Sequence, residues 1–302
     1  MNLHACTLCP RKCGADRTLG VGVCGGSDTV RIARAALHFG EEPCISGTKG
    51  SGTVFFSGCA LQCRFCQNHK ISKDNFGTEV SVKRLAELFL ELQDKGAHNI
   101  NLVTPSHYAP WIADALRMTK PNLCIPIVCN CSGYESDEIL DTFADLIDIY
   151  LPDLKYFSSE KSLRYSNTSD YFDVASKALQ RMYAQVGPCE FTSDGLMKKG
   201  MLIRHLVLPE GKRDSITLLK WISKTFPSEN IRISLMRQYA PCGDLKECPE
   251  LNRKLFSIEY NTVVRQANSL GMQGFIQGKG CDNFAMTPNF DLTGVTKKGT
   301  LL

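Results

Sequence analysis

Short apolar runs alternate with amphipathic stretches along most of this chain. Runs rich in β-branched and other apolar residues predict six strands, at 53–57, 99–104, 125–130, 146–151, 202–208 and 231–236. Apolar residues that recur at helical spacing predict six helices, at 82–95, 108–119, 136–143, 171–186, 215–225 and 251–270. The regular alternation of the two kinds of element indicates repeated βα units.

Repeated βα units predict an α/β fold with a parallel sheet, because parallel strands need crossover connections. We expect a partial or full (β/α) barrel built from these units. The expected division is a cysteine-rich module and linker at 1–50, a (β/α)6 core at 51–278 and a tail at 279–302. Glycine-containing segments predict a loop or lid at 187–200 and a partly disordered tail after Gly278.

Composition and charge narrow the class of protein. A formal net charge of +4 over 302 residues gives no reason to expect nucleic acid as a partner. The N-terminus lacks a basic and then apolar leader, and no apolar run approaches the roughly 18–20 residues that span a bilayer. Fifteen cysteines in such a chain indicate metal binding in a reducing cytoplasm rather than a secreted disulfide scaffold or a membrane protein.

Three of the cysteines form a loop directly after the first predicted strand. Cys59, Cys63 and Cys66 have the spacing Cys-x3-Cys-x2-Cys. Thiolates suit zinc or iron–sulfur clusters, but a structural zinc site usually has four ligands. Three thiolates on a [4Fe–4S] cluster leave one iron without a protein ligand, and an open metal position allows chemistry. An ordinary metal knuckle or a set of buried thiols is the alternative.

A second group of four cysteines lies near the N-terminus and matches a closed metal site: Cys6, Cys9, Cys13 and Cys24. Thiolates alone do not decide between zinc and a second iron–sulfur cluster there. We interpret three other cysteines as packing thiols: Cys44, Cys129 and Cys131. Cys242 and Cys248, six residues apart around a glycine, could form a weak third chelate, but the lack of further ligands nearby disfavours it. Cys44 is also a spare ligand for either group.

At the cysteine loop the sequence resembles the radical S-adenosylmethionine (SAM) superfamily, whose signature has an aromatic residue just before the last cysteine. Phe65 occupies that position. Gln67, Asn68 and later motifs are similar to the activases of glycyl-radical enzymes, in particular to the subfamily related to pyruvate formate-lyase activating enzyme. The resemblance implies an open (β/α)6 barrel, a [4Fe–4S] cluster and SAM. It also implies a low-potential electron donor of the flavodoxin or ferredoxin type and a glycyl-radical enzyme as partner.

Active-site groups of α/β barrels gather where strands end, so the predicted strand exits supply candidate residues. Asn130 and Ser132 can hydrogen-bond to ribose hydroxyls, or they form a polar cap for the next helix. Asp153 and Lys155 resemble the activase Asp-Leu-Lys motif, which implies a catalytic pair that lines the SAM pocket. The alternative for that pair is a surface ion pair.

Two further residues belong to the expected cofactor pocket together with Phe65. Arg204 resembles the activase arginine that contacts SAM, and a buried arginine needs an anion to face. Gln238 stands near the place of an activase histidine. Activases also carry Gly-Gly-Glu at the second strand exit, where this chain has Thr104, Pro105 and Ser106 and hence no carboxylate.

These residues support three hypotheses about function. The leading one is a radical SAM enzyme that abstracts hydrogen from a glycine of a partner enzyme. The missing Gly-Gly-Glu stretch and the N-terminal cysteines favour instead the same chemistry on a small molecule or another residue. The third is a non-catalytic electron carrier in which Cys44 blocks the open iron.

Overall fold

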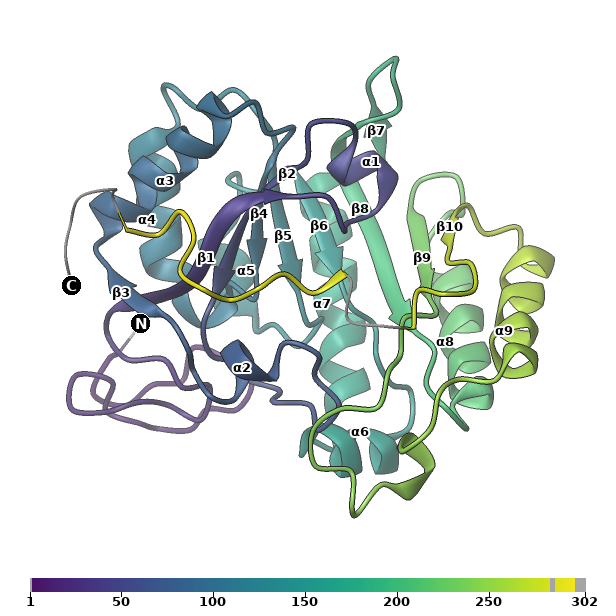
Figure 1. Cartoon of the computed structure of the whole chain (residues 1–302). Coiled ribbons are helices and arrows are strands. Elements are labelled where there is room, and N and C mark those ends of the chain that lie inside the picture. Colours follow the sequence, from purple (N-terminus) through teal and green to yellow (C-terminus); the bar gives the residue numbers. More distant parts are fainter. Residues whose placement is uncertain (1, 283–285, 297–302) are drawn as a thin grey trace.

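A mixed sheet forms the centre of the molecule (Figure 1). The computed structural model describes residues 2–282 and 286–296. Its strands are β1 (Val30–His38), β2 (Ser51–Phe56), β3 (Thr78–Val80), β4 (Ile100–Val103), β5 (Ile127–Cys131), β6 (Ile149–Pro152), β7 (Glu190–Phe191), β8 (Met197–Leu206), β9 (Arg232–Met236) and β10 (Gly274–Ile276). They lie in the order β10-β9-β8-β6-β5-β4-β2-β1-β3, and β7 pairs with β8 outside this path.

The central strands of this sheet are the six that the sequence predicts. β2, β4, β5, β6, β8 and β9 are consecutive neighbours and pair in parallel. This arrangement confirms the predicted α/β fold. β1 and β3 extend the sheet antiparallel on one side, and β10 adds a parallel strand on the other. Within the described residues the two ends of the strand path do not pair, so the barrel is open.

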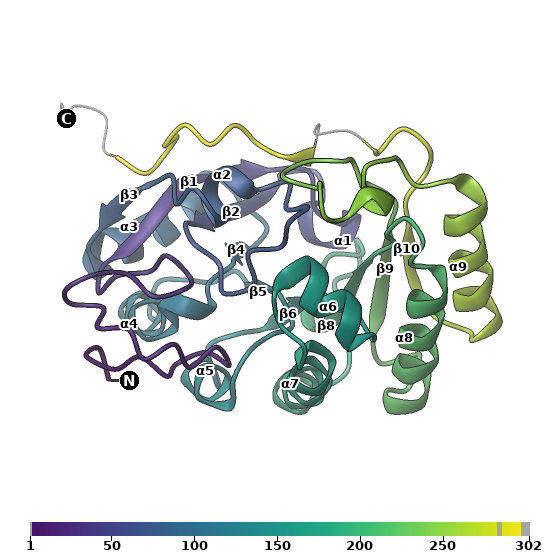
Figure 2. The same cartoon turned by 90° about the horizontal axis from the view of Figure 1, so that it is seen from below.

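Helices cover the outer side of this arc. The described helices are α1 (Pro43–Ser46), α2 (His69–Ser72), α3 (Val82–Asp94), α4 (Ala109–Thr119), α5 (Asp137–Thr142), α6 (Ser159–Ser166), α7 (Tyr171–Val186), α8 (Lys212–Thr225) and α9 (Ser257–Ser269), with 3-10 turns at Ser106–Tyr108 and Pro249–Leu251. Figure 2 shows α4, α5, α7 and α8 along the outside of the strands. Serine side chains cap three of the starts by accepting backbone N–H groups, for example Ser81 before α3.

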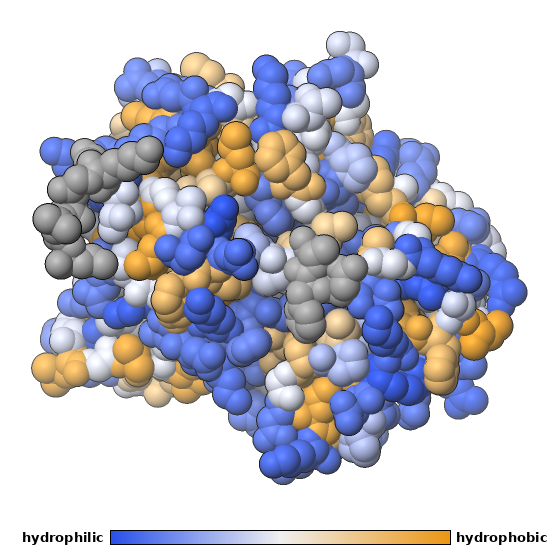
Figure 3. Space-filling view, viewed as in Figure 1, coloured by the Kyte–Doolittle hydropathy of each residue, from blue (hydrophilic) through white to orange (hydrophobic). Residues whose placement is uncertain are grey.

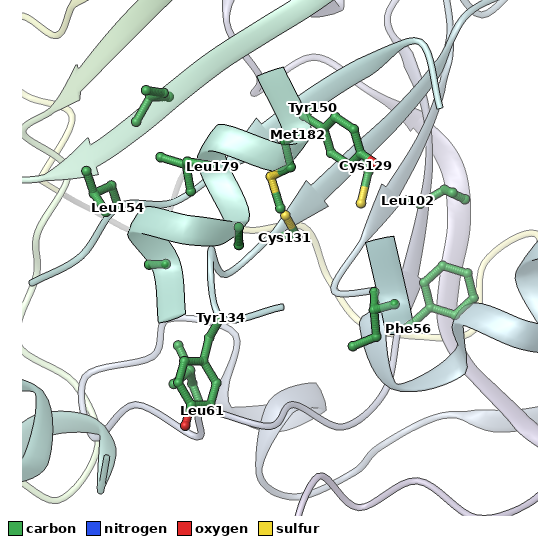
Figure 4. Close-up of a cluster of buried hydrophobic side chains, with 14 of the residues drawn as sticks. Phe56, Leu61, Leu102, Cys129, Cys131, Tyr134, Tyr150, Leu154, Leu179 and Met182 are labelled. Atoms are coloured by element: carbon green, nitrogen blue, oxygen red, sulfur yellow. The ribbon is translucent and has the colours of Figure 1, made fainter. Parts of the chain in front are cut away.

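The core lies between the sheet and these helices. The predicted stripe of Leu85, Leu88, Phe89 and Leu92 on α3 is buried. Figure 4 shows Cys129 and Cys131 of β5 in the same core, beside Tyr150 of β6 and Met182 of α7. Both thiols are therefore packing groups, as their spacing predicted.

Three segments differ from their predictions for local reasons. The loop predicted at 187–200 contains β7 and the start of β8, which form a short antiparallel pair. The last helix begins at Ser257 rather than at 251, because the Glu259 side chain accepts the N–H of Phe256 and closes the first turn there. No strand was predicted at β1, because arginines interrupt its apolar positions. β1 lies in the segment expected as a separate module and linker, residues 1–50, but it pairs with β2 in the main sheet.

The described part of the tail packs along β1. The N–H of Ala35 donates to the carbonyl of Thr293 at 2.9 Å, and that of Leu292 donates to the carbonyl of Ala33 at 3.0 Å. Gly294 lies so close that a Cβ would sit 1.9 Å from the Ala35 carbonyl oxygen. The predicted disorder is thus wrong for these residues, and its remainder, at 283–285 and 297–302, lies outside the described residues. Among the described helices, none has the length and apolar character to cross a membrane.

Candidate active site

One pocket lies at the carboxyl ends of the parallel strands. Its lining includes every residue that the sequence assigned to the catalytic cluster and the cofactor: Cys59, Cys63, Phe65, Cys66, Asn130, Ser132, Asp153, Lys155, Arg204 and Gln238. These residues come from five different strands or the loops after them. Parallel strands present their carboxyl ends on the same side, which explains how residues so far apart in sequence meet.

The cysteine loop after β2 turns its sulfurs into this pocket. Hydroxyl groups reach two of the thiols: Ser166 donates to Cys63 Sγ at 3.0 Å and Ser72 donates to Cys66 Sγ at 3.3 Å. Burial and the neighbouring Cys63 raise the pKa of Cys66 to about 12, and burial also raises the pKa of Cys59. In the absence of a cation, these two thiols are therefore protonated at neutral pH.

Aromatic side chains pack around Phe65 of the cysteine loop. Phe65 meets Tyr156, Tyr165 and Tyr239 edge to face, with ring centroids 6.0–6.5 Å apart. Tyr239 donates to the Leu251 carbonyl and packs behind Phe65 instead of entering the pocket. The ring that completes the cysteine signature thus fixes the loop against a dry surface.

Asp153 and Lys155 form a half-buried ion pair inside the pocket. Lys155 Nζ donates to Asp153 Oδ2. Although burial acts to lower it, the Asp153 carboxylate and the nearby cysteines raise the pKa of Lys155. The hydroxyl of Tyr171 lies 2.8 Å from the carbonyls of both Ser132 and Asp153, so it joins the exits of β5 and β6. The pair is therefore neither a surface ion pair nor an isolated motif.

Arg204 faces two carboxylates that the sequence reading missed. Its guanidinium Nη1 donates to Glu41 Oε2 at 3.0 Å, and its Nε lies 3.5 Å from Glu42 Oε1. Glu41 also accepts from the amides of Asn101 at 3.0 Å and Asn130 at 3.4 Å. Burial raises the pKa of Glu41, and the Arg204 guanidinium opposes that rise. The only local signal was the pair of acids before Pro43, in a segment that reads as a surface loop.

The other expected pocket residues are held by polar neighbours. Ser132 donates to the buried carboxyl group of Glu135 at 3.1 Å, and Ser106 from the second exit donates to the same oxygen at 2.8 Å. The side chain of Gln238 accepts from Gln277 at 2.8 Å. Thr104 lines the pocket, but its exit brings no carboxylate there. Glu41 supplies the acid that this exit lacks.

The N-terminal cysteines lie behind the cysteine loop and not in the pocket. The carbonyl of Cys24 accepts the N–H of Cys59 at 2.8 Å, whereas Cys6, Cys9, Cys13 and Cys24 are absent from the pocket lining. In the part of the chain that the structure describes, no group of three or more His, Cys, Asp or Glu side chains stands ready to hold a metal ion.

The spare cysteines have structural positions. Cys44 is buried in α1 beside Ile45 and Val128 and does not line the pocket. It is thus badly placed to block an iron held by the cysteine loop, and the electron-carrier hypothesis loses its fourth ligand. Cys242 donates to the carbonyl of Phe65 at 3.2 Å, and Cys248 is fully buried.

Comparisons with known proteins bear on this site. Residues 53–197 match the family described as the radical SAM superfamily. The uncharacterized protein MJ0674 of Methanocaldococcus jannaschii is 29% identical over 278 residues, which cover 88% of this chain and 75% of that protein.

Two solved structures share the fold. A radical SAM methyltransferase from Sphaerobacter thermophilus is 13% identical, with a TM-score of 0.52 over 77% of this chain and 68% of that one. SuiB of Streptococcus suis, solved with the precursor peptide SuiA, is 12% identical, with a TM-score of 0.51 over 74% of this chain. The match covers 47% of SuiB, so the present chain spans about half of that protein's length.

The residues present fit the cofactors that this family implies. Three thiols enter the pocket, and Arg204 Nε is a buried donor without a hydrogen-bond partner among the described residues. Glu42 Oε2 is a buried acceptor that also lacks a hydrogen-bond partner among the described residues. Such atoms suit a ligand that carries both an anionic and a cationic group. Residues 53–197 therefore form a radical SAM superfamily domain, and this family implies a [4Fe–4S] cluster and SAM as its cofactors.

Proposed function

We propose that this enzyme reductively cleaves SAM to a 5′-deoxyadenosyl radical, which abstracts a hydrogen atom from a glycine of a partner enzyme. One electron comes from a low-potential donor of the flavodoxin or ferredoxin type, and methionine is the second product. The observation that carries the proposal is the convergence of ten predicted residues on one pocket. The choice of a glycine rests on the similarity of the Asp-Leu-Lys and Arg-His-Leu-Val-Leu-Pro stretches to activases.

The cysteine loop would hold the cluster through Cys59, Cys63 and Cys66. The hydroxyl groups of Ser166 and Ser72 already point at two of these sulfurs. Hydrogen bonds to cluster sulfurs are one of the factors that set a cluster's reduction potential. We expect both serines to make the site easier to reduce.

The charged residues of the pocket match the charges of SAM. Three carboxylates, on Glu41, Glu42 and Asp153, surround the two cations of Lys155 and Arg204. The set has an excess of acid, which favours a sulfonium and an amino group, while the two cations can face a carboxylate. Glu41 and Asp153 would hold Arg204 and Lys155 in place, and the catalytic pair would orient the cofactor.

A second candidate keeps the same radical but directs it to a small molecule or to another kind of residue. Met286, Thr287 and Pro288 of the tail line the pocket beside the cysteine loop. They narrow the space through which the peptide segment of a partner would enter. This observation, together with the Thr104 exit, favours a small substrate.

The test begins with anaerobic reconstitution, reduction and addition of SAM. The proposal predicts 5′-deoxyadenosine and methionine in equal amounts, and protein shown to contain the cluster that forms neither would overturn it. Electron paramagnetic resonance on candidate partners then separates the two targets. A glycyl doublet supports the activase, whereas deuterium that moves from a small substrate into 5′-deoxyadenosine supports the second candidate.

A further inference from the structure

The N-terminal loop, residues 2–29, has a fixed place without a hydrophobic core of its own. It contains no helix or strand, and Leu8 is its only buried apolar side chain apart from cysteines. Leu19, Val21 and Val23 are exposed, and Figure 3 shows hydrophobic side chains at the lower left, where Figure 1 places this loop. Segments that bury so little apolar surface usually depend on a metal or on disulfides.

Two of the four cysteine sulfurs of this loop lie close to Gly22. The sulfurs of Cys13 and Cys24 both lie 3.4 Å from the place that a Cβ on Gly22 would take, so they are no further apart than twice that distance. A side chain at Gly22 would fill the space between them. The thiols of Cys6 and Cys13 both interact electrostatically with that of Cys9, which in turn interacts with that of Cys24. Gly22 thus leaves room between the sulfurs of Cys13 and Cys24.

The main chain makes short-range hydrogen bonds at two of these cysteines. The N–H of Lys12, three residues after Cys9, donates to the Cys9 carbonyl at 2.9 Å. The N–H of Gly26 lies 3.4 Å from the sulfur of Cys24, two residues before it. A main-chain donor beside a sulfur suits the thiolate, which is the form that binds metal.

The same loop is fastened directly to the cysteine loop of the active site. Besides the bond from the Cys59 N–H to the Cys24 carbonyl, the amide of Gln62 donates to the Val23 carbonyl at 2.6 Å. Gly58 is required at this junction: its φ is 89°, and a Cβ would sit 2.3 Å from the Cys24 carbonyl oxygen. The position of Cys24 therefore fixes the first cluster cysteine.

We propose that Cys6, Cys9, Cys13 and Cys24 bind one structural metal centre, and that this centre holds the N-terminal loop against the catalytic cysteine loop. Four thiolates complete a tetrahedral site or a cluster without an open position, so this centre does not cleave SAM. Zinc and an iron–sulfur cluster share the tetrathiolate chemistry, and binding of either releases the thiol protons. The site does not depend on the proposed reaction.

The metal is tested in protein that lacks the catalytic ligands. In a Cys59→Ser, Cys63→Ser, Cys66→Ser variant, purified without oxygen, we expect about one zinc per chain, or iron with sulfide, to remain after dialysis against a weak chelator. A further Cys9→Ser change should remove it, while Cys124→Ser, at an exposed cysteine, should not. The proposal is overturned if the triple variant holds neither metal after reconstitution with zinc or with iron and sulfide.

Hydrogen exchange on the same triple variant tests whether the metal centre holds the N-terminal loop against the cysteine loop. Stripping the metal with a strong chelator should speed amide exchange in 57–62 by roughly tenfold or more, and zinc or iron and sulfide should restore the protection. The helices on the far side, such as α8, serve as the internal control because a folded protein keeps their protection. Unchanged exchange in 57–62 on metal removal would reject the fastening role.

Discussion

The two cysteine groups meet at Gly58 but differ in what surrounds them. Cys59, Cys63 and Cys66 follow a strand of the main sheet and open into a pocket, whereas the four N-terminal cysteines belong to a loop without regular structure. The first group has one ligand too few for a closed site and the second has enough. On our proposals for the two groups, the number of thiols and the element that carries them separate a reactive site from a structural one.

Two buried arginines repeat this contrast. Arg204 faces the carboxylates of Glu41 and Glu42 in the pocket. Arg17 in the N-terminal loop donates to the carbonyls of Ser27 and His107, at 2.8 Å each, and its guanidinium carbon lies 4.9 Å from the centroid of the Trp111 ring. In the pocket, the charge of Arg204 is balanced by carboxylates. In the N-terminal loop, the charge of Arg17 is stabilised by carbonyl dipoles and by an aromatic ring.

Removal of a catalytic thiol should have the largest effect. Cys59→Ala should reduce 5′-deoxyadenosine formation to the level of a control without enzyme, because two thiolates no longer hold the cluster at the strand exit. Product analysis by chromatography measures the loss. Cys124→Ala, at an exposed position outside the pocket, should keep full activity, and an equal loss in both variants would contradict the assignment.

Removal of an N-terminal thiol should weaken the reaction without abolishing it. Cys9→Ala should lower the rate of SAM cleavage roughly 10- to 100-fold, the range found when support outside the ligand shell is lost. The ultraviolet–visible spectrum of the catalytic cluster should persist. A complete loss of that cluster would erase the proposed distinction between the two groups.

Arg204→Met should destabilise the fold by about 3–5 kcal/mol, because two buried carboxylates would lose their partner. Urea unfolding of metal-free protein under reducing conditions measures this. Arg181→Met is the matched control: Arg181 pairs with Asp137 and Asp141 on the surface, where the loss should stay below about 1 kcal/mol. Similar losses would show that the pocket charges are solvated.

Gly58→Ala should lower the free energy of unfolding by about 2–4 kcal/mol, because of strain at positive φ and a clash with the Cys24 carbonyl. Gly271→Ala isolates the first contribution, since Gly271 has a φ of 67° and open space where a Cβ would go. Its cost should be about 1 kcal/mol. Thermal unfolding of both variants gives the difference, and equal costs would mean that the two loops do not press against each other.

The smallest effect concerns His107, which lies between the groups and contacts the Ser57 carbonyl at 2.8 Å. Burial lowers the pKa of His107 to about 4. The unfolded chain therefore takes up a proton below pH 6.5 while the folded chain does not, and stability falls as the pH drops toward 4. Relative to His107→Gln, the wild-type protein should lose about 2 kcal/mol more between pH 7 and 5. Urea unfolding at each pH measures the free energy of unfolding of both proteins. If these free energies fell equally between pH 7 and 5, the result would contradict the burial of a neutral His107 ring.

Sequence patterns predicted the six parallel strands because these depend on local periodicity, while the strand ends and the resemblance to activases together supplied the pocket residues. They missed Glu41 and Glu42, since acids beside a proline resemble a solvated loop. They also left His107 and Arg17 without a role. The burial of these four residues depends on contacts between segments far apart in the chain, such as that of Arg17 with the His107 carbonyl, and no local pattern encodes such contacts.

The contact at Gly58 also bears on the order in which the cofactor is installed. The N–H groups of Gly58 and Cys59 are taken by the carbonyls of Ile71 and Cys24, so the first ligand is anchored by protein on both sides. We expect that cluster assembly meets a loop whose first cysteine is already set. Assembly would then adjust Cys63 and Cys66 around that point, so that damage to the N-terminal loop would shift the first ligand and slow turnover while the cluster is retained.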